Sequence, residues 1–168
     1  FSHIISSSTE NTKIYGGGVS LWIQKKQYLK GNLIFKQCIF DNNENHHSNT
    51  ILAQGGAFQI GYSSSIANIS LEFDRCQFKK NKCINGKGGA LGININHDII
   101  MNNCIFEDNT AAQEGGAIYV WGKIIKPEDQ QAPDLPDSLQ MNSITINGCT
   151  FNGNQATNAY GIYTEEDN

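Results

Sequence analysis

The stretch from Cys76 to Asn109 reads CQFKKNKCINGKGGALGININHDIIMNNCIFEDN and decides the fold of the whole chain. The same motif, Cys-x-Phe-x-x-Asn, stands at both ends of this stretch, and Cys104 follows Cys76 by 28 residues. A Gly-Gly-Ala-Leu unit at 88–91 lies between the two copies. Two motifs that alternate along a chain indicate a repeat protein.

Both motifs recur through the chain. The copies of the first are Cys38/Phe40/Asn43, Cys76/Phe78/Asn81, Cys104/Phe106/Asn109 and Cys149/Phe151/Asn154. The copies of the second are Gly16-Gly17-Gly18-Val19, Gly55-Gly56-Ala57-Phe58, Gly88-Gly89-Ala90-Leu91 and Gly115-Gly116-Ala117-Ile118. We take Tyr160-Gly161-Ile162-Tyr163 as a degenerate fifth copy, because the step from Phe151 to Tyr160 equals that from Phe106 to Gly115. The segments between motifs vary in length, which indicates a shared core with variable loops.

Apolar residues alternate with polar ones beside each motif, as in strands with one buried face. Leu91 and Ile93 follow a double glycine in this way, and Leu71 and Phe73 precede a cysteine. Such short strands bury their apolar faces when successive copies stack, with equivalent strands about 4.8 Å apart. We therefore predict an all-β fold: a right-handed, single-stranded parallel β-helix, or solenoid, of about 4–5 coils with three short strands each and inserted loops. The hand follows from the preference of parallel connections for right-handed crossovers.

A coil of this size needs sharp corners, and two residue types suit them. Glycine adopts positive φ without steric cost, and asparagine is among the few other residues that do so. Stacked Asn side chains can also hydrogen-bond along the column. The predicted corner residues are Gly16, Gly17, Gly55, Gly56, Gly88, Gly89, Gly115, Gly116, Asn43, Asn81, Asn109 and Asn154. The predicted core columns are Cys38, Cys76, Cys104 and Cys149, and Phe40, Phe78, Phe106 and Phe151.

Three segments interrupt the pattern and are predicted to be loops. Residues 123–140 contain all three prolines and several acidic residues, so this segment should be exposed. Residues 41–54 contain His46-His47, which we expect to be solvated, and residues 61–68 end at Asn68, in the glycosylation sequon Asn68-Ile69-Ser70. We treat residues 1–168 as a single β-helix segment of a longer array.

Paired Gly-Gly-Ala-[Ile/Leu/Val] and Phe-x-x-Asn units resemble the polymorphic outer-membrane protein repeat over nearly the whole chain. The resemblance implies a pectin-lyase-like β-helix in a large extracellular or surface-displayed protein, with adhesion as its usual role. Similar repeats occur in secreted or membrane-anchored proteins of protists such as ciliates, whose AT-rich genomes suit this Ile-, Asn- and Lys-rich composition. Two copies depart from the repeat: Gly16-Gly17-Gly18-Val19 and Tyr160-Gly161-Ile162-Tyr163.

Composition excludes several classes of partner. The net charge of −4 and the pI of about 5.5 argue against nucleic acid, and the apolar runs are too short for membrane insertion of this segment. The motif cysteines have no CxxC spacing for zinc and should be buried thiols. Cys83 lies outside the motif, in a predicted loop, and could be free or paired. We predict no cofactor and no metal site.

The same superfamily contains polysaccharide lyases and hydrolases, which require grouped carboxylates. The acidic residues of the repeats occupy different motif positions and form no column: Asp74, Asp98, Glu107, Asp108 and Glu114. We therefore predict no catalytic residues and favour an extracellular or cell-surface scaffold or adhesin-like module. It would contact other protein chains, cell-surface ligands or glycans. The alternatives are a structural subunit of a filament or surface coat, and a carbohydrate-active β-helix enzyme.

Overall fold

The computed structural model describes residues 5–8, 17–24, 29–48, 54–63, 67–94, 97–123 and 143–167. These residues form strands and turns without a helix, and every strand pair among them is parallel. The predicted all-β chain of stacked parallel strands is therefore confirmed. The predicted loop at 123–140 lies outside the described residues, apart from Lys123 at the end of a strand, and stays a prediction.

The strands form four parallel sheets. The first sheet contains β2 (Val19–Gln24), β6 (Phe58–Ser63), β10 (Leu91–Asn94), β14 (Ile118–Lys123) and β17 (Ile162–Asp167). The second contains β3 (Leu29–Lys36), β7 (Ala67–Asp74), β11 (His97–Asn102) and β15 (Ile144–Asn147). The third contains β4 (Ile39–Asp41), β8 (Gln77–Lys79), β12 (Ile105–Glu107) and β16 (Thr150–Asn152). The fourth contains β1 (Ile5–Ser8), β5 (Glu44–His47), β9 (Lys82–Cys83) and β13 (Thr110–Ala111).

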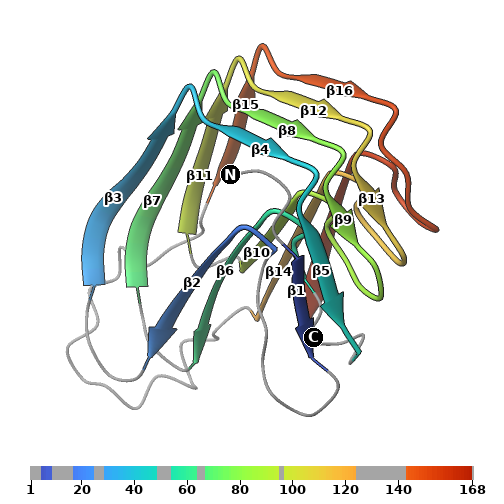
Figure 1. The fold of residues 1–168 in the computed structure, drawn as a ribbon. Helices are drawn as coiled ribbons and strands as arrows, with labels where there is room; N and C mark the ends of the chain where they lie inside the picture. The colour runs from blue at the N-terminus through green and yellow to red at the C-terminus, as the bar shows by residue number, and fades with distance from the viewer. Residues whose placement is uncertain are drawn as a thin grey trace.

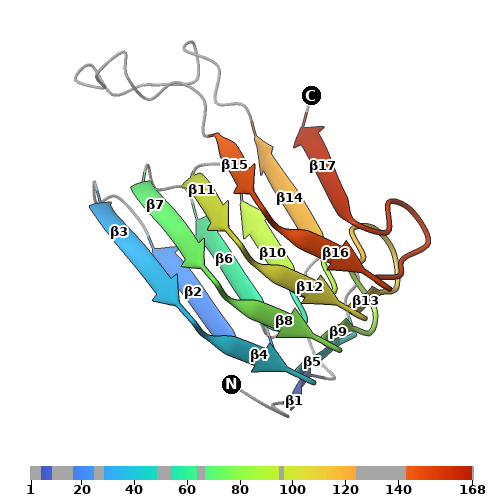
Figure 2. The same cartoon turned by 90° about the horizontal axis from the view of Figure 1, so that it is seen from above.

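The chain visits these sheets in turn and then returns to the first one (Figures 1 and 2). We call one such passage a coil: β2–β5, β6–β9 and β10–β13 are three successive coils. The arrangement is consistent with a parallel β-helix. Each of these coils has four strands, so the expectation of three was wrong. The missed strands β9 and β13 have two residues each, too few for apolar alternation to show.

The register places equivalent motif residues at the same position in every coil. Phe78 pairs with Phe40 on one side and Phe106 on the other, and Phe106 pairs in turn with Phe151. In the second sheet Leu71 aligns with Ile99. The 28-residue spacing therefore corresponds to one full coil.

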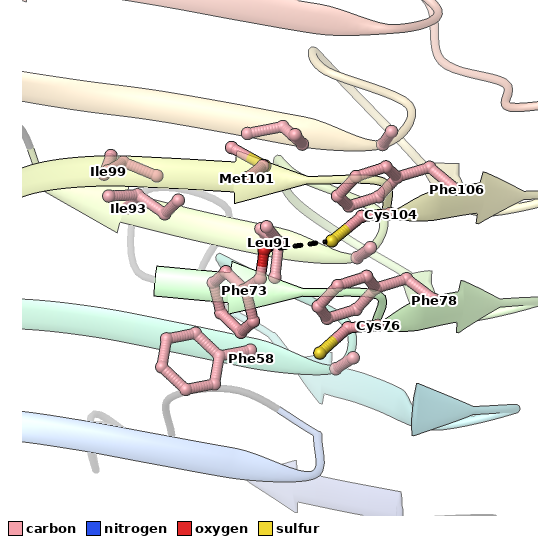
Figure 3. Close-up of a cluster of buried hydrophobic side chains, with 14 of the residues drawn as sticks. Phe58, Phe73, Cys76, Phe78, Leu91, Ile93, Ile99, Met101, Cys104 and Phe106 are labelled. Atoms are coloured by element: carbon pink, nitrogen blue, oxygen red, sulfur yellow. Dashed lines mark hydrogen bonds between the residues drawn. The ribbon is translucent and has the colours of Figure 1, made fainter. Parts of the chain in front are cut away.

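The core lies between the sheets (Figure 3). It contains the predicted Cys and Phe columns, of which Cys38, Cys149 and Phe151 are only partly buried, and also the alanines of the Gly-Gly-Ala motifs. Strand residues on the inner face have no exposed surface in the middle coils, among them Leu71, Phe73, Ile99 and Met101. The alternation seen in the sequence thus gave the correct inward face. Burying each such side chain stabilises the fold by about 1.5–3 kcal/mol, so burial dominates the stability.

The two glycines of each pair have different roles. The first, at Gly55, Gly88 and Gly115, has positive φ of 65–71°, as predicted for a corner. The second does not have positive φ. A Cβ on Gly89 would instead lie 2.0 Å from the carbonyl oxygen of Gly116 in the next coil. The second glycine is therefore required by the close approach of two coils.

The motif asparagines are not left-handed, so this part of the corner prediction was wrong. Positive φ occurs one residue earlier, at Asn42, Lys80, Asp108 and Gly153. The preceding residue makes the turn, and the motif asparagine is then free to point its side chain into the coil. A second set of left-handed residues precedes the motif cysteines: Gln37, Arg75, Asn103 and Gly148.

Two other expectations need correction. Strand pairing aligns Ile162 with Ile118, so Ala159 and Tyr160 occupy the positions of Gly115 and Gly116. The motif spacing had placed Tyr160 at the position of Gly115, which was wrong by one residue. Ala159 accordingly has a φ of 52°, close to that of Gly115. The predicted loop at 41–54 contains strand β5, and Asn68 lies within β7, although its side chain is outside the described part.

Candidate functional site

Four phenylalanines form a continuous stack in the third sheet. The ring centroids of Phe78 lie 4.7 Å from Phe40 and 4.8 Å from Phe106, with interplanar angles of 6° and 4°. Phe106 stacks on Phe151 at 4.8 Å in the same way. The rings follow the coil spacing because each extends inward from the same strand position. This stack fixes the height of each coil relative to its neighbours.

Beside the rings, the motif asparagines form a buried hydrogen-bonded ladder. Asn109 Nδ2 donates to the carbonyl of Phe78 and to Oδ1 of Asn154, both at 2.9 Å. Its own Oδ1 accepts from the backbone N–H and the Nδ2 of Asn81 at 3.0 and 2.9 Å. Asn81 bonds to Asn43 in the same arrangement. The four side chains thereby satisfy buried polar groups in successive coils.

The motif cysteines form a third column, at the corner between the second and third sheets. Three of the four thiols donate to a carbonyl of the preceding coil, beginning with Cys76 Sγ to Phe35 at 3.3 Å and Cys104 Sγ to Phe73 at 3.3 Å. Cys149 Sγ donates to the carbonyl of Met101 in the same way, at 3.4 Å. The backbone N–H of Cys104 in turn donates to Cys149 Sγ at 3.3 Å.

These contacts perturb the acidity of the thiols. The hydrogen bond with the Cys104 thiol lowers the pKa of Cys76 to about 7, and the same bond raises the pKa of Cys104. Burial raises the pKa of Cys38, with the neighbouring Cys76 adding to the effect. In a coupled pair of thiols, one thiol loses its proton at a lower pH while the other stays protonated.

Cys83 lies outside this column. It belongs to β9 and is buried, whereas the sequence placed it in a loop. Burial raises its pKa to about 12. All five cysteines are free thiols within this chain, and the alternative that Cys83 pairs with a residue outside this segment stays a prediction.

A polar group on β5 and β9 includes Glu44, His46 and Lys82. His46 Nε2 lies 2.6 Å from Glu44 Oε2, and Lys82 Nζ lies 3.2 Å from Glu44 Oε1. The hydrogen bond from His46 is the main cause of a lowered pKa at Glu44, with Lys82 adding to it. His47 is fully buried on the opposite face of the strand. The expectation that both histidines are solvated was wrong, because they alternate across a strand and do not lie in a loop.

A second polar group lies outside the first sheet. Lys87 Nζ is 3.2 Å from the hydroxyl of Tyr119, 4.7 Å from the centre of its ring and 3.4 Å from Glu114 Oε2. Tyr119 is 1% exposed, which makes it a buried side chain on an outward position. This group could not be predicted from apolar alternation, because the turn before the double glycine covers an outward face that alternation assigns to solvent. The signal was the aromatic residue two places after the alanine of the Gly-Gly-Ala motif.

The acidic residues considered for catalysis stay apart. Asp74 and Asp98 lie at different positions of the second sheet, and Glu107 pairs with Lys79 in the third. Asp108 is at a left-handed corner and Glu114 in the group with Lys87. The described residues hold no group of three or more His, Cys, Asp or Glu side chains able to hold a metal ion. Among the same residues, no helix is long and apolar enough to cross a membrane.

Part of one coil and the strand after it resembles a known repeat family. Residues 103–120 match the Chlamydia polymorphic membrane protein repeat. The matched segment runs from the corner before Cys104 through the Asn109 ladder position to the Gly115-Gly116-Ala117-Ile118 corner. The match covers a small part of the chain, so it shows similarity of this coil to that repeat. No curated protein and no solved structure matches the chain significantly.

Proposed function

We propose that this chain is a segment of a cell-surface or extracellular scaffold, a right-handed β-helical rod that displays its outer residues to ligands on other proteins or cells. The observation that carries the proposal is the similarity of residues 103–120 to a repeat of the Chlamydia polymorphic membrane proteins. The solenoid fold supports it, because stacked coils make a stiff body whose length grows with the number of repeats.

The distribution of sequence variation between coils supports the same role. The inner columns stay apolar in every coil, and one of them repeats a single residue type, Phe40, Phe78, Phe106 and Phe151. Outer positions of the same strands change from coil to coil. One such outer column is Ile39, Gln77, Ile105 and Thr150. A constant interior with a variable exterior suits a protein that presents different surfaces on one framework.

A catalytic role is a weaker proposal, because the acids of successive coils lie in separate columns. Glycoside cleavage requires two carboxylates on either side of one bond. The proposed module binds its ligands and leaves them chemically unchanged.

Two measurements on cells that express the protein test this proposal. An antibody against the folded chain should label intact cells, and brief protease treatment of those cells should remove the label. Beads coated with the purified chain should bind to target cells, and the soluble chain should compete with that binding. Labelling that appears only after permeabilisation contradicts the surface location. Bead binding no greater than that of beads coated with heat-unfolded chain contradicts the adhesive role.

A further inference from the structure

The second glycine of each corner faces the carbonyl oxygen of its counterpart in the next coil. A Cβ added to Gly17, Gly56 or Gly89 would lie 2.0–2.1 Å from that oxygen. One added to Gly116 would lie 2.2 Å from the carbonyl oxygen of Tyr160. These distances are far below a packing contact of about 3.5–4.0 Å, so stacking in this register requires a residue without a Cβ.

Tyr160 occupies this position in the corner before β17, at one end of the stack (Figure 2). Strand pairing places Ile162 opposite Ile118, so Tyr160 corresponds to Gly116. Its side chain is 68% exposed, and its Cβ stands where the carbonyl oxygen of a further coil would have to lie. We propose that Tyr160 ends the stack: no further coil adds to this end of the rod in the register that the described coils share.

The inner column of the first sheet changes character at the same end. Ile60, Ile93 and Val120 occupy one register position in successive strands, and all three are buried. The next residue in this column is Thr164, which is exposed. A threonine hydroxyl can bond to water, so this position does not require a further coil to cover it. Terminal repeats of solenoid proteins are polar for the same reason.

The other sheets would accept a further coil, so the corner decides. Ile144 and Ile146 in the second sheet are 36% and 37% exposed, and a further strand would cover them. The ladder could also continue past Asn154, whose Nδ2 donates to the carbonyl of Phe106 as the other ladder residues do to theirs. A longer array would therefore extend from the other end of the rod. This inference goes beyond the proposed scaffold role and does not depend on it.

A coil inserted at this end tests the proposal. Residues 95–121 correspond to one coil by register, and a second copy of them is inserted between Glu165 and Glu166. Trp121 pairs with Glu165, so the copy begins and ends at equivalent positions. Every protein in the comparison carries Thr164→Val, which makes the inner column apolar. The insertion variants then differ only at the corner or at a control position.

With Tyr160 in place, we expect the inserted coil to stay outside the folded unit. Chymotrypsin should cut it at the copied Phe106, and the intact mass of the product identifies that cut. The slope of the unfolding free energy against denaturant should equal that of the chain without the insertion, because no additional buried surface is exposed. Tyr160→Gly should slow this cut by about tenfold or more and raise the slope.

Two variants separate the Cβ from other effects of the substitution. Tyr160→Ala removes the ring but keeps the Cβ, so the coil should stay as sensitive as with tyrosine. Asn158→Gly adds a glycine to the same exposed corner and keeps Tyr160, so it should also leave the coil sensitive. Protection with Tyr160 in place, protection in either of these variants, or no protection in Tyr160→Gly would each overturn the proposal.

The same copy inserted between Trp121 and Gly122 is the reference for a coil that can stack, since it follows the Gly115-Gly116 corner. We expect this internal copy to be protected and to raise the slope as Tyr160→Gly does. An internal copy that is cut as fast as the copy behind Tyr160 would also overturn the proposal, because a corner with two glycines would then not be sufficient for stacking.

Discussion

The side chain of Asn109 in the asparagine ladder connects three coils by hydrogen bonds. Asn109 bonds to Asn81 and Phe78 on one side and to Asn154 on the other. Replacing Asn109 with alanine would leave several of these buried groups without a partner, at about 1–3 kcal/mol for each. We expect Asn109→Ala to lower the free energy of unfolding by about 3–5 kcal/mol, measured by chemical denaturation.

Asn152→Ala is the control for this change. Asn152 lies in β16 of the same repeat unit as Asn154, but its side chain is exposed. Its replacement should change the free energy of unfolding by less than about 0.5 kcal/mol. Equal effects of the two variants would mean that the ladder contributes no more than a surface amide.

Glu44 is expected to make stability depend on pH. Its hydrogen bond from His46 and its contact with Lys82 lower its pKa below the ordinary value of 4.5. A carboxyl with a lower pKa in the folded state contributes stability above its unfolded pKa and loses it as the pH falls through the folded pKa. Wild type should therefore lose stability below about pH 4.5, and Glu44→Gln should lose less over that interval.

The measurement is the thermal midpoint between pH 6 and pH 3, roughly the range over which this carboxyl takes up its proton. Glu72→Gln provides the comparison, since it removes a carboxyl from the outer side of β7 and keeps Glu44 with both partners. A Glu44→Gln profile parallel to that of wild type would show that the contacts of Glu44 do not contribute.

At the scale of the element, the second glycine of each corner allows two coils to approach closely, because it has no Cβ. A Cβ on Gly89 would lie 2.0 Å from the Gly116 carbonyl oxygen and 2.6 Å from the Thr110 nitrogen. Both are backbone atoms, one in the corner before β14 and one in β13, and cannot rotate away. We expect Gly89→Ala to lower the free energy of unfolding by at least about 2–3 kcal/mol. Gly161→Ala is the control, because a Cβ there meets nothing within 4 Å. A stable Gly89→Ala protein would show that the coils can separate at this corner at little cost.

Some features of the strands and corners could be predicted from the sequence, and others could not. Motif spacing and alternation were enough for the parallel strands and inner columns, because a repeated inward residue must repeat its environment. Alternation could not reveal the two-residue strand β9, nor that Cys83 within it is buried. Residue type also could not tell which residue takes positive φ, since Lys80 turns the corner while Asn81 forms the ladder. Asn81 bonds to Asn109 in the next coil, and such contacts between coils cannot be read from the sequence of a single repeat.

At the scale of the whole molecule, each coil contacts mainly the coil before and the coil after it. The stability of such a stack is approximately a sum of coil terms and interfaces. Charges add a preferred order: Lys79 pairs with Glu107 of the next coil at 3.4 Å, and Lys82 pairs with Glu44 of the previous coil. Because every coil has similar inward residues, one coil could replace another in the stack. The two ion pairs favour the natural order of the coils.

This organisation predicts that one whole coil can be removed. Deleting residues 76–103 joins Arg75 to Cys104 and removes β8–β11, which is one strand from each sheet. Phe106 would then stack on Phe40, and the ladder would run from Asn43 to Asn109. We expect a folded protein with the same far-ultraviolet spectrum and a lower denaturation midpoint. The dependence of its free energy on denaturant should also be weaker, because less surface is exposed on unfolding.

The deletion brings Asp41 beside Glu107, where Lys79 stood between them. Adding Glu107→Lys to the deletion should recover part of the lost stability, by no more than about 1 kcal/mol for an exposed pair.

Deleting residues 76–89 instead removes half a coil, so a strand of the first sheet would follow directly after one of the second. That variant should not fold, because every later inward residue would enter the wrong sheet. If the full-coil and half-coil deletions unfold alike, the coils do not act as separable units.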